Sequence, residues 1–238
     1  VGGRVGEGAL FSDVGGEATR AGASPVPVAQ ELDRVIAVIE AVRKNFDICI
    51  SVDTSSPQVM QAALGAGAEL VNDVRALTRE GAIAAVAASG ASACLMHMQG
   101  KPQSMQDKIV YANLIDEVFE FLKVRVQICV DGGIERSRLL VDPGFGFGKS
   151  IEHNYQMLAN LEEFHKLNVP VLAGMSRKSM IGNLLQRTID QRLAGNIAVA
   201  TVAAQKGAQI IRVHDVKETV DAVKIINMIN AYRNNNER

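Results

Sequence analysis

The sequence predicts an α/β protein in which parallel β-strands are covered by helices, and two observations point to this class. Short apolar runs alternate with longer segments of helical period along the chain. The chain also has no tryptophan and only 4% aromatic residues, so its core must be built from Val, Ile, Leu and Ala, which suits buried parallel strands. No linker, low-complexity tract or change of composition divides it, and we expect residues 1–238 to form a single domain.

Seven short apolar runs are the predicted strands. In chain order they are Leu10–Val14, Ile48–Val52, Leu70–Val74, Ala93–Met96, Leu139–Val141, Val169–Ala173 and Gln209–Val213. Strands that alternate with helices in this way are expected to pair in parallel, with right-handed crossovers.

Segments with helical period separate the strands. The clearest are Val28–Lys44, Pro57–Leu64, Asn113–Ile128, Asn154–Leu167, Arg192–Lys206 and Thr219–Tyr232. We count seven strand–helix units, whereas a closed (β/α)8 barrel has eight. Either the sheet is open or one unit is missing, and because only residues 1–8 precede the first strand, we expect the first unit to be truncated or absent from this sequence.

Charge and cysteine content exclude several classes of protein. The 25 basic and 26 acidic residues leave a net charge of −1, so no broad field attracts nucleic acid or an anionic membrane. The three cysteines, Cys49, Cys94 and Cys129, lie in apolar contexts, and we expect free thiols in a reducing compartment.

No apolar run approaches the roughly 20 residues that span a bilayer, and the chain does not open with a signal sequence, so the expected location is cytoplasmic.

The stretch DPGFGFGKS, from Asp142 to Ser150, resembles a phosphate-binding loop at first sight. A Walker loop, however, needs a glycine where Pro143 stands, and a dinucleotide-binding loop needs a different glycine spacing. The acid and the glycine run that follow the apolar residues Leu139–Val141 therefore call for another ligand.

Polar residues follow every predicted strand, at the end where a parallel barrel carries its active site. One polar strand end is uninformative, because Asp, Asn and Ser are ordinary turn and cap residues. Seven together describe a polar ring at one mouth of a barrel, which is the default position of a binding site. Its acids, amide and bases suit a ligand with a hydrogen-bonding heterocycle at one end and phosphate at the other; they are Asp53, Asp142, Asn72, Arg20, Lys178, Arg212 and His214.

Seven motifs resemble, in order and in spacing, those of the dihydropteroate synthases of bacterial folate biosynthesis. They are DVGGEATRAGA, SVDTS, VNDV, LMHMQG, DPGFGFGK, GMSRKSMIG and IIRVHDV, and the resemblance runs from about Leu10 to the C-terminal helix. It implies a (β/α)8 TIM-type barrel whose first strand and loop are missing from this chain. It also implies a transferase that joins 6-hydroxymethyl-7,8-dihydropterin diphosphate to p-aminobenzoate, releasing pyrophosphate, and that is inhibited by sulfonamides.

The resemblance also implies roles for individual residues at the pterin end. Asp142 would accept the two neighbouring N–H donors of the pterin edge, with Asp53 and Asn72 completing that edge. Lys178 would contact the pterin, while Met96 and Phe147 would line the substrate site. Unpaired polar groups in a dry pocket cost about 1–3 kcal/mol each, so such a set discriminates between rings.

The remaining implied roles lie at the anionic end of the substrates. Arg212 and His214, two positions apart on the last strand, would point the same way and meet the diphosphate, with Lys178, Arg212 and His214 forming the catalytic set. Ser179 would bind the p-aminobenzoate carboxylate, and Thr19 and Arg20 would order their loop over the site. Mg2+ is implied as the counterion of the diphosphate, and the family's protein ligand for it is absent from this chain, so no metal-ligating residue is assigned.

The sequence departs from the family pattern in two places. The motif NVTPDSFSDGG is absent, and the usual STRPG loop has alanine at Ala18 and Ala21. Losing the fixed φ of proline at Ala21 is expected to loosen that loop and the p-aminobenzoate pocket.

Other functions stay open at this point. A methyltetrahydrofolate-binding methyltransferase barrel would share the acids and the amide but would not need the anion-binding residues. A non-catalytic pterin-binding protein would keep the pocket without turnover, a sugar-phosphate barrel would leave Asp53, Asn72 and Asp142 unmatched, and a Schiff-base role for Lys178 would make the protein an aldolase. The apolar segments Gly195–Lys206 and Val220–Ile229 could pack together or against a second subunit, and the family is typically dimeric, so a homodimer is expected.

Overall fold

The computed structural model describes residues 1–18, 22, 24, 26–100 and 109–235. Five parallel strands pair in chain order: β1 (Phe11–Gly15), β2 (Cys49–Asp53), β3 (Leu70–Asp73), β4 (Ser92–Met96) and β5 (Leu139–Asp142). Two further strands, β6 (Leu172–Ala173) and β7 (Ile210–Ile211), form a parallel pair, and a bridge from Val141 to Val171 joins them to β5. The described strands therefore form an open parallel barrel with β1 and β7 at its edges.

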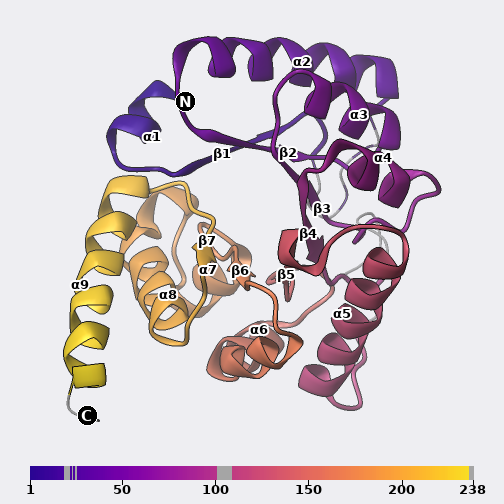
Figure 1. Cartoon of the computed structure of the whole chain (residues 1–238). Coiled ribbons are helices and arrows are strands. Elements are labelled where there is room, and N and C mark those ends of the chain that lie inside the picture. The colour runs from indigo at the N-terminus through magenta and orange to yellow at the C-terminus, as the bar shows by residue number, and fades with distance from the viewer. Residues whose placement is uncertain (19–21, 23, 25, 101–108, 236–238) are drawn as a thin grey trace.

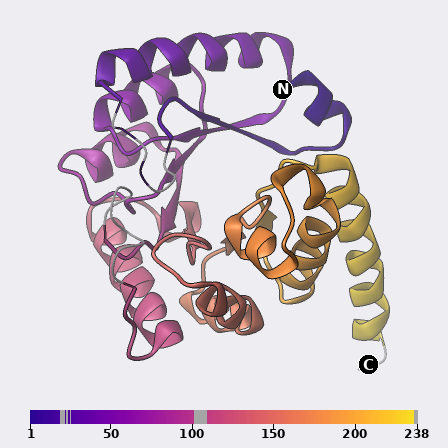
Figure 2. The same ribbon diagram turned by 180° about the vertical axis from the view of Figure 1, so that it is seen from behind.

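Helices cover the outside of the strands (Figures 1 and 2). Their bounds are α1 (Gly2–Gly6), α2 (Val28–Asn45), α3 (Pro57–Gly65), α4 (Ala82–Ser89), α5 (Leu114–Asp131), α6 (Ile151–Ala159), α7 (Ser179–Leu185), α8 (Leu193–Gln205) and α9 (Val216–Asn235), with 3-10 turns at Arg136–Arg138, Leu161–Leu167 and Ile189–Gln191. On α2 the buried residues Val35, Ile39 and Val42 recur at helical spacing and form one apolar stripe. No helix among the described residues is long and apolar enough to cross a membrane.

The barrel has two cores because strand side chains alternate between its faces. Side chains that point outward, such as Val71, Leu95 and Val141, pack against the helices in the larger core. The smaller core lies inside the barrel and contains Leu70, Cys94, Leu140 and Leu172, with Ile210 packed against it.

Several predicted boundaries were wrong. The last two strands are each two residues long, against five predicted, and the predicted helix Asn154–Leu167 is divided into α6 and a 3-10 turn. Helices α4 and α7 were missed: α4 is almost wholly apolar, so it shows no alternation of faces, and α7 spans only seven residues.

Candidate active site

The polar residues at the strand ends lie on the inner face of the barrel. Asn72 stands two positions after Leu70, and Asp142 stands two positions after Leu140, and both leucines belong to the inner core. Because the side-chain period of a strand is two, each polar residue shares the face of its apolar neighbour. The sequence thereby places a layer of polar groups directly above the inner apolar layer.

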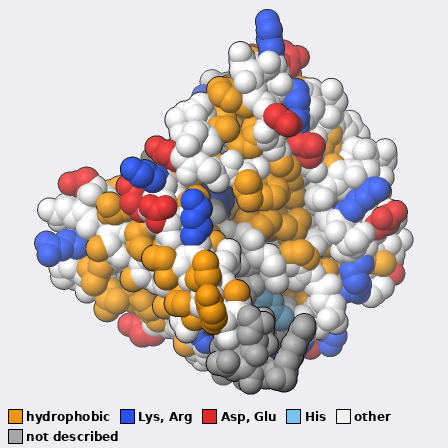
Figure 3. Space-filling view, turned by 60° about the vertical axis from the view of Figure 1, so that its left-hand side comes forward, with side chains coloured by type: hydrophobic (Ala, Val, Ile, Leu, Met, Phe, Trp, Pro, Cys, Tyr) orange, Lys and Arg blue, Asp and Glu red, His pale blue; other side chains and the backbone are white. Residues whose placement is uncertain are grey.

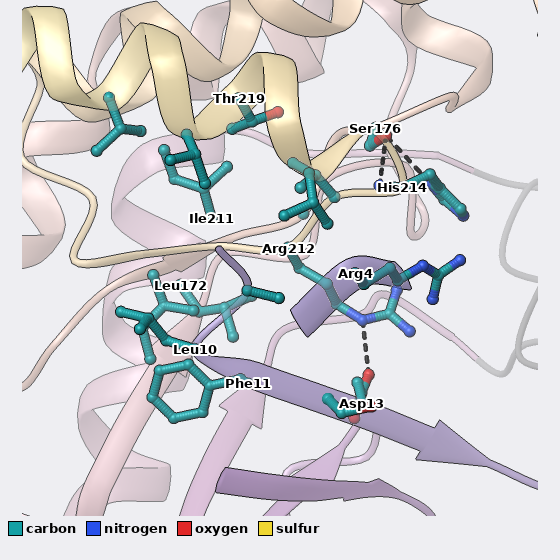
Figure 4. A pocket seen from close by; sticks show the side chains of 18 of the residues that line it. Arg4, Leu10, Phe11, Asp13, Leu172, Ser176, Ile211, Arg212, His214 and Thr219 are labelled. Atoms are coloured by element: carbon teal, nitrogen blue, oxygen red, sulfur yellow. Dashed lines mark hydrogen bonds and ion pairs between the residues drawn. The ribbon is translucent and has the colours of Figure 1, made fainter. Parts of the chain in front are cut away.

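Four of these groups form a cluster across β1, β2, β3 and the residue after β7. The Arg212 Nε donates to Asp13 Oδ2 at 2.6 Å, and its Nη2 lies 3.7 Å from Asp53 Oδ2. The Asn72 Nδ2 donates to the same Asp13 oxygen at 3.4 Å. Arg212 thus joins the two open edges of the barrel, and Asp13 holds its guanidinium (Figure 4).

The cluster contains carboxylate oxygens that have no partner. Among the described residues, the side-chain atoms Asp13 Oδ1 and Asp53 Oδ1 are buried without a hydrogen bond. Burial and the neighbouring Asp13 carboxylate raise the pKa of Asp53 from 3.8 to about 7, while Arg212 opposes the shift. Buried acceptors without donors are costly unless a ligand supplies the donors.

Replacing Asp53 by asparagine is expected to stabilise the ligand-free protein at pH 8. The folded pKa of Asp53 lies above its unfolded value, so the folded state binds more protons between pH 3.8 and about 7, and stability is lost as the pH rises through this window. The amide of the Asp53→Asn variant carries no charge and does not suffer that loss. Urea unfolding of both proteins from pH 5 to pH 8 should show a gap that widens to a plateau above pH 7, whereas a gap independent of pH would contradict the assignment.

A second group of residues surrounds Asp142 at the end of β5. Asp142 Oδ1 accepts a hydrogen bond from the Gly144 backbone at 2.7 Å, which fixes the orientation of the carboxylate. The Lys178 Nζ donates to the Phe145 carbonyl at 2.6 Å and lies 4.7 Å from the centroid of the Phe147 ring. Burial raises the pKa of Asp142, opposed chiefly by Lys178, and burial lowers the pKa of Lys178 to about 8, opposed by Asp142.

A network of hydrogen bonds orients His214 beside this site. Its backbone N–H donates to Ser176 Oγ at 3.2 Å, and its Nδ1 lies 3.0 Å from the same oxygen. The next residue, Asp215, accepts from Asn196 at 2.6 Å and forms an ion pair with Arg177, so it supports the loop. Burial and the nearby arginines lower the pKa of His214, which leaves its imidazole neutral at pH 7 in the ligand-free protein.

A cavity of about 1040 Å³ lies between the β1 and β7 edges. Its polar end is lined by Arg4, Asp13, Asn72, Ser176, Lys178, Arg212 and His214, and its apolar end includes Leu10, Phe11, Ile48, Leu70, Leu172 and Ile211. Figure 3 shows hydrophobic side chains gathered beside lysine and arginine side chains on one side of the molecule. The cavity therefore combines an apolar part with a part lined by charged and hydrogen-bonding side chains.

The structure brings most of the predicted site residues to one mouth of the barrel. Asn72, Lys178, Arg212 and His214 line the cavity. Asp53, Met96 and Asp142 are the last residues of β2, β4 and β5, and Phe147 lies in the glycine run after β5. Ser179 is exposed at the first residue of α7. Thr19 and Arg20 lie outside the described residues.

Two residues with a clear role in the site were not identified from the sequence. Asp13 stands at a strand end and could be read either way, whereas its contact with Arg212 spans 199 positions and could not be seen. Ser176 belongs to the GMSRKSMIG motif, and only the fold places it against His214.

The donor chemistry of the site does not favour a metal held by protein side chains alone. Within the described ranges, no group of three or more His, Cys, Asp or Glu residues could hold a metal ion. The side chains that face the anionic end are cations and a histidine, which are suited to phosphate oxygens.

Comparison with known proteins is consistent with this geometry. The family model for pterin binding enzymes matches residues 3–214. Over 222 residues the chain is 50% identical to the dihydropteroate synthase of Escherichia coli K12, covering 93% of this chain and 79% of that protein, and it is 49% identical to the Haemophilus influenzae enzyme, covering 92% and 80%.

Solved structures agree with the sequence comparison. The fold is similar to the Yersinia pestis dihydropteroate synthase in a sulfonamide drug complex, with a TM-score of 0.95 at 48% identity over 97% of this chain and 84% of that one. It is also similar to the Xanthomonas albilineans enzyme with 4-aminobenzoic acid, with a TM-score of 0.91 at 48% identity over 96% and 82%. The predicted barrel fold is therefore confirmed.

Proposed function

The chain belongs to the dihydropteroate synthase family of pterin-binding enzymes, and from this premise we propose how its own residues serve the reaction. The family condenses 6-hydroxymethyl-7,8-dihydropterin diphosphate with p-aminobenzoate, so the protein is a transferase. The observation that carries the proposal is the pair of unpartnered, buried carboxylate oxygens of Asp13 and Asp53, next to Asn72 and Arg212.

The carboxylates and the amide bind the polar edge of the pterin. The aminopyrimidinone edge presents neighbouring N–H donors. Asp142 and Asp53 supply acceptor oxygens that are already oriented and are shielded from water. Asn72 can both donate and accept, which matches the mixed character of that edge. Met96, which pairs in register with Asp142, lies beside the acid and covers the ring.

The recognition of this edge can be tested directly by calorimetry. A pterin should bind at least about 100-fold more tightly than the same ring without its 2-amino group, because the missing donors leave buried carboxylates unpaired. Equal affinities for the two ligands would refute the proposed role of Asp53, Asn72 and Asp142.

The cations hold the diphosphate and stabilise its departure. The Arg212 Nε is occupied by Asp13, so its Nη groups remain to bind phosphate oxygens or to stack on the pterin. His214, oriented by Ser176, stands two positions further along the chain. When the C–O bond to the diphosphate breaks, pyrophosphate leaves with the electron pair, and these donors stabilise the charge on its oxygens.

The second substrate then attacks the pterin methylene carbon. The amino nitrogen of p-aminobenzoate forms the new C–N bond and loses a proton to solvent. We assign Phe147 and Lys178 to the wall between the two substrates, because the Lys178 amine lies over the Phe147 ring. Ser179, exposed at the start of α7, binds the carboxylate, and Thr19 and Arg20 complete this end. The protein acts chiefly by positioning its substrates.

Three further properties belong to the proposal. Mg2+ bound to the diphosphate would neutralise part of the charge that Arg212 and His214 face. The protein works as a homodimer in the cytoplasm, and residues 1–238 are one domain. The three cysteines are free thiols, which supports a reducing compartment such as the cytoplasm. The helices of the C-terminal half expose large apolar side chains, which supports the dimer; among them are Leu184, Ile189, Ile225, Met228 and Tyr232. Light scattering that gave only a 25.5 kDa species would refute the dimer.

A further inference from the structure

Lys149 is a buried lysine that none of the proposed steps uses. It is only 3% exposed. Its Nζ lies 2.9 Å from His97 Nδ1, 3.0 Å from the Gly144 carbonyl and 3.1 Å from the Phe147 carbonyl. The amine also lies 3.5 Å from the His97 carbonyl, so its hydrogen bonds are made within the protein, and burial lowers the pKa of Lys149 to about 7.

These acceptors belong to two different loops. His97 follows β4, whereas Gly144 and Phe147 lie in the glycine run after β5. The loops are in direct backbone contact, since a Cβ added to Gly144 would stand 1.9 Å from the His97 carbonyl and one added to Gly148 would stand 2.7 Å from the Gln99 carbonyl. Both glycines have positive φ, 77° and 61°. The glycine run is therefore folded tightly against the loop after β4, and the hydrogen bonds of Lys149 link these two loops.

His97 is the side-chain partner of this lysine, with its Nδ1 at hydrogen-bond distance from the amine. Burial, together with the neighbouring Lys149 charge, lowers the pKa of His97 to about 2, so its ring stays neutral. The ring also packs edge-on against Phe121, with centroids 5.0 Å apart. His97 is therefore a buried residue whose ring lies against Lys149 and Phe121.

The part of the glycine run that Lys149 holds carries Phe147. The Phe147 ring is half-buried, and the Lys178 amine lies over it. Asp142, in contrast, is the last residue of β5, where it pairs with Met96, and its carbonyl accepts from the His97 N–H at 2.9 Å. Loss of the Lys149 bonds should therefore shift Phe147 and leave Asp142 in place.

We propose that Lys149 is a positioning residue for p-aminobenzoate: by fastening the glycine run to the β4 loop, it sets where the Phe147 ring stands in the site. The proposal rests on the function proposed above, in which Phe147 lines the p-aminobenzoate side. Lys149 touches no substrate. It acts through a backbone carbonyl and determines affinity for the second substrate rather than for the pterin.

The test is the kinetics of Lys149→Met, which keeps an unbranched side chain one atom shorter and removes its donors. The Michaelis constant for p-aminobenzoate should rise about tenfold or more, while that for the pterin diphosphate changes less than about threefold. Lys123→Met is the matched control, because Lys123 is an exposed lysine on α5 that pairs with Glu120. Equal rises in both constants would show a general loss of structure, and no change would show that Lys149 is dispensable; either result overturns the proposal.

A second substitution shows whether the effect passes through Phe147. In a Phe147→Leu background, Lys149→Met should raise the p-aminobenzoate constant by less than about twofold, because the ring it positions is gone. A full rise of about tenfold in that background would contradict the proposal.

If Lys149→Met does not fold, His97→Phe is the alternative, because it keeps the ring packing and removes one hydrogen-bond partner of Lys149. It should raise the Michaelis constant for p-aminobenzoate selectively, by about threefold; no selectivity there would also overturn the proposal. Absence of pyrophosphate release by the unaltered protein would instead contradict the proposed function.

Discussion

Asp142→Asn is expected to weaken pterin binding by about 2–4 kcal/mol, which corresponds to roughly 30-fold to 1000-fold in Kd. The reason lies in the orientation of this carboxyl group. Its Oδ1 accepts from the Gly144 N–H at 2.7 Å, so the carbonyl oxygen of the introduced amide must keep that position. The amide nitrogen then replaces the second oxygen and presents donors to the donors of the pterin edge.

Calorimetry with a pterin measures this effect without turnover. Asp33→Asn is a suitable control, because Asp33 is an exposed residue on α2 and undergoes the same chemical change. The control should bind as the unaltered protein does. Undiminished affinity in Asp142→Asn would remove Asp142 from the pterin site and with it the explanation offered for the DPGFGFGKS stretch.

Arg212→Ala is expected to damage binding of the diphosphate substrate far more than binding of a pterin without phosphate. Loss of a charge-assisted pair of bonds to phosphate should raise the Kd of the diphosphate about 100-fold, whereas the plain pterin loses only a stacking contact. The substitution also removes the cation that lies 2.6 Å from Asp13 and 3.7 Å from Asp53. Asp53, whose pKa of about 7 is held down by Arg212, should then take up a proton at neutral pH.

Competition binding with the two ligands separates these contributions. Arg138→Ala provides the control, since Arg138 is a partly exposed arginine with an acidic neighbour at 3.7 Å. Measurements at pH 7 and pH 9 reveal the contribution of the carboxyl protonation. Similar losses for both ligands at both pH values would place Arg212 outside the anion site.

Sequence reasoning predicted the sheet and the polar ring because both follow from short-range patterns. The runs that became β3, β4 and β5 are apolar, and the period of two places Asn72, Met96 and Asp142 on one face without further information. The final strands were predicted too long, because an apolar run does not show how many of its residues find partners across the opening of the barrel.

Contacts between distant parts of the chain could not be predicted in this way. Lys149 looked like the end of a glycine motif, and nothing local indicated that His97, 52 positions earlier, would accept its hydrogen bond. The same holds for Asp13 and Arg212, whose pairing requires the barrel to bring its two edges together. The roles of Thr19 and Arg20 remain predictions from the resemblance alone.

The most direct test of the central claim is pyrophosphate release from the pterin diphosphate in the presence of Mg2+ and p-aminobenzoate. The account predicts release that depends on both substrates, yields dihydropteroate in equal amount, is inhibited by a sulfonamide and is lost in Asp142→Asn. Pterin binding without any pyrophosphate release would contradict it and would indicate a pterin-binding protein that does not catalyse the condensation.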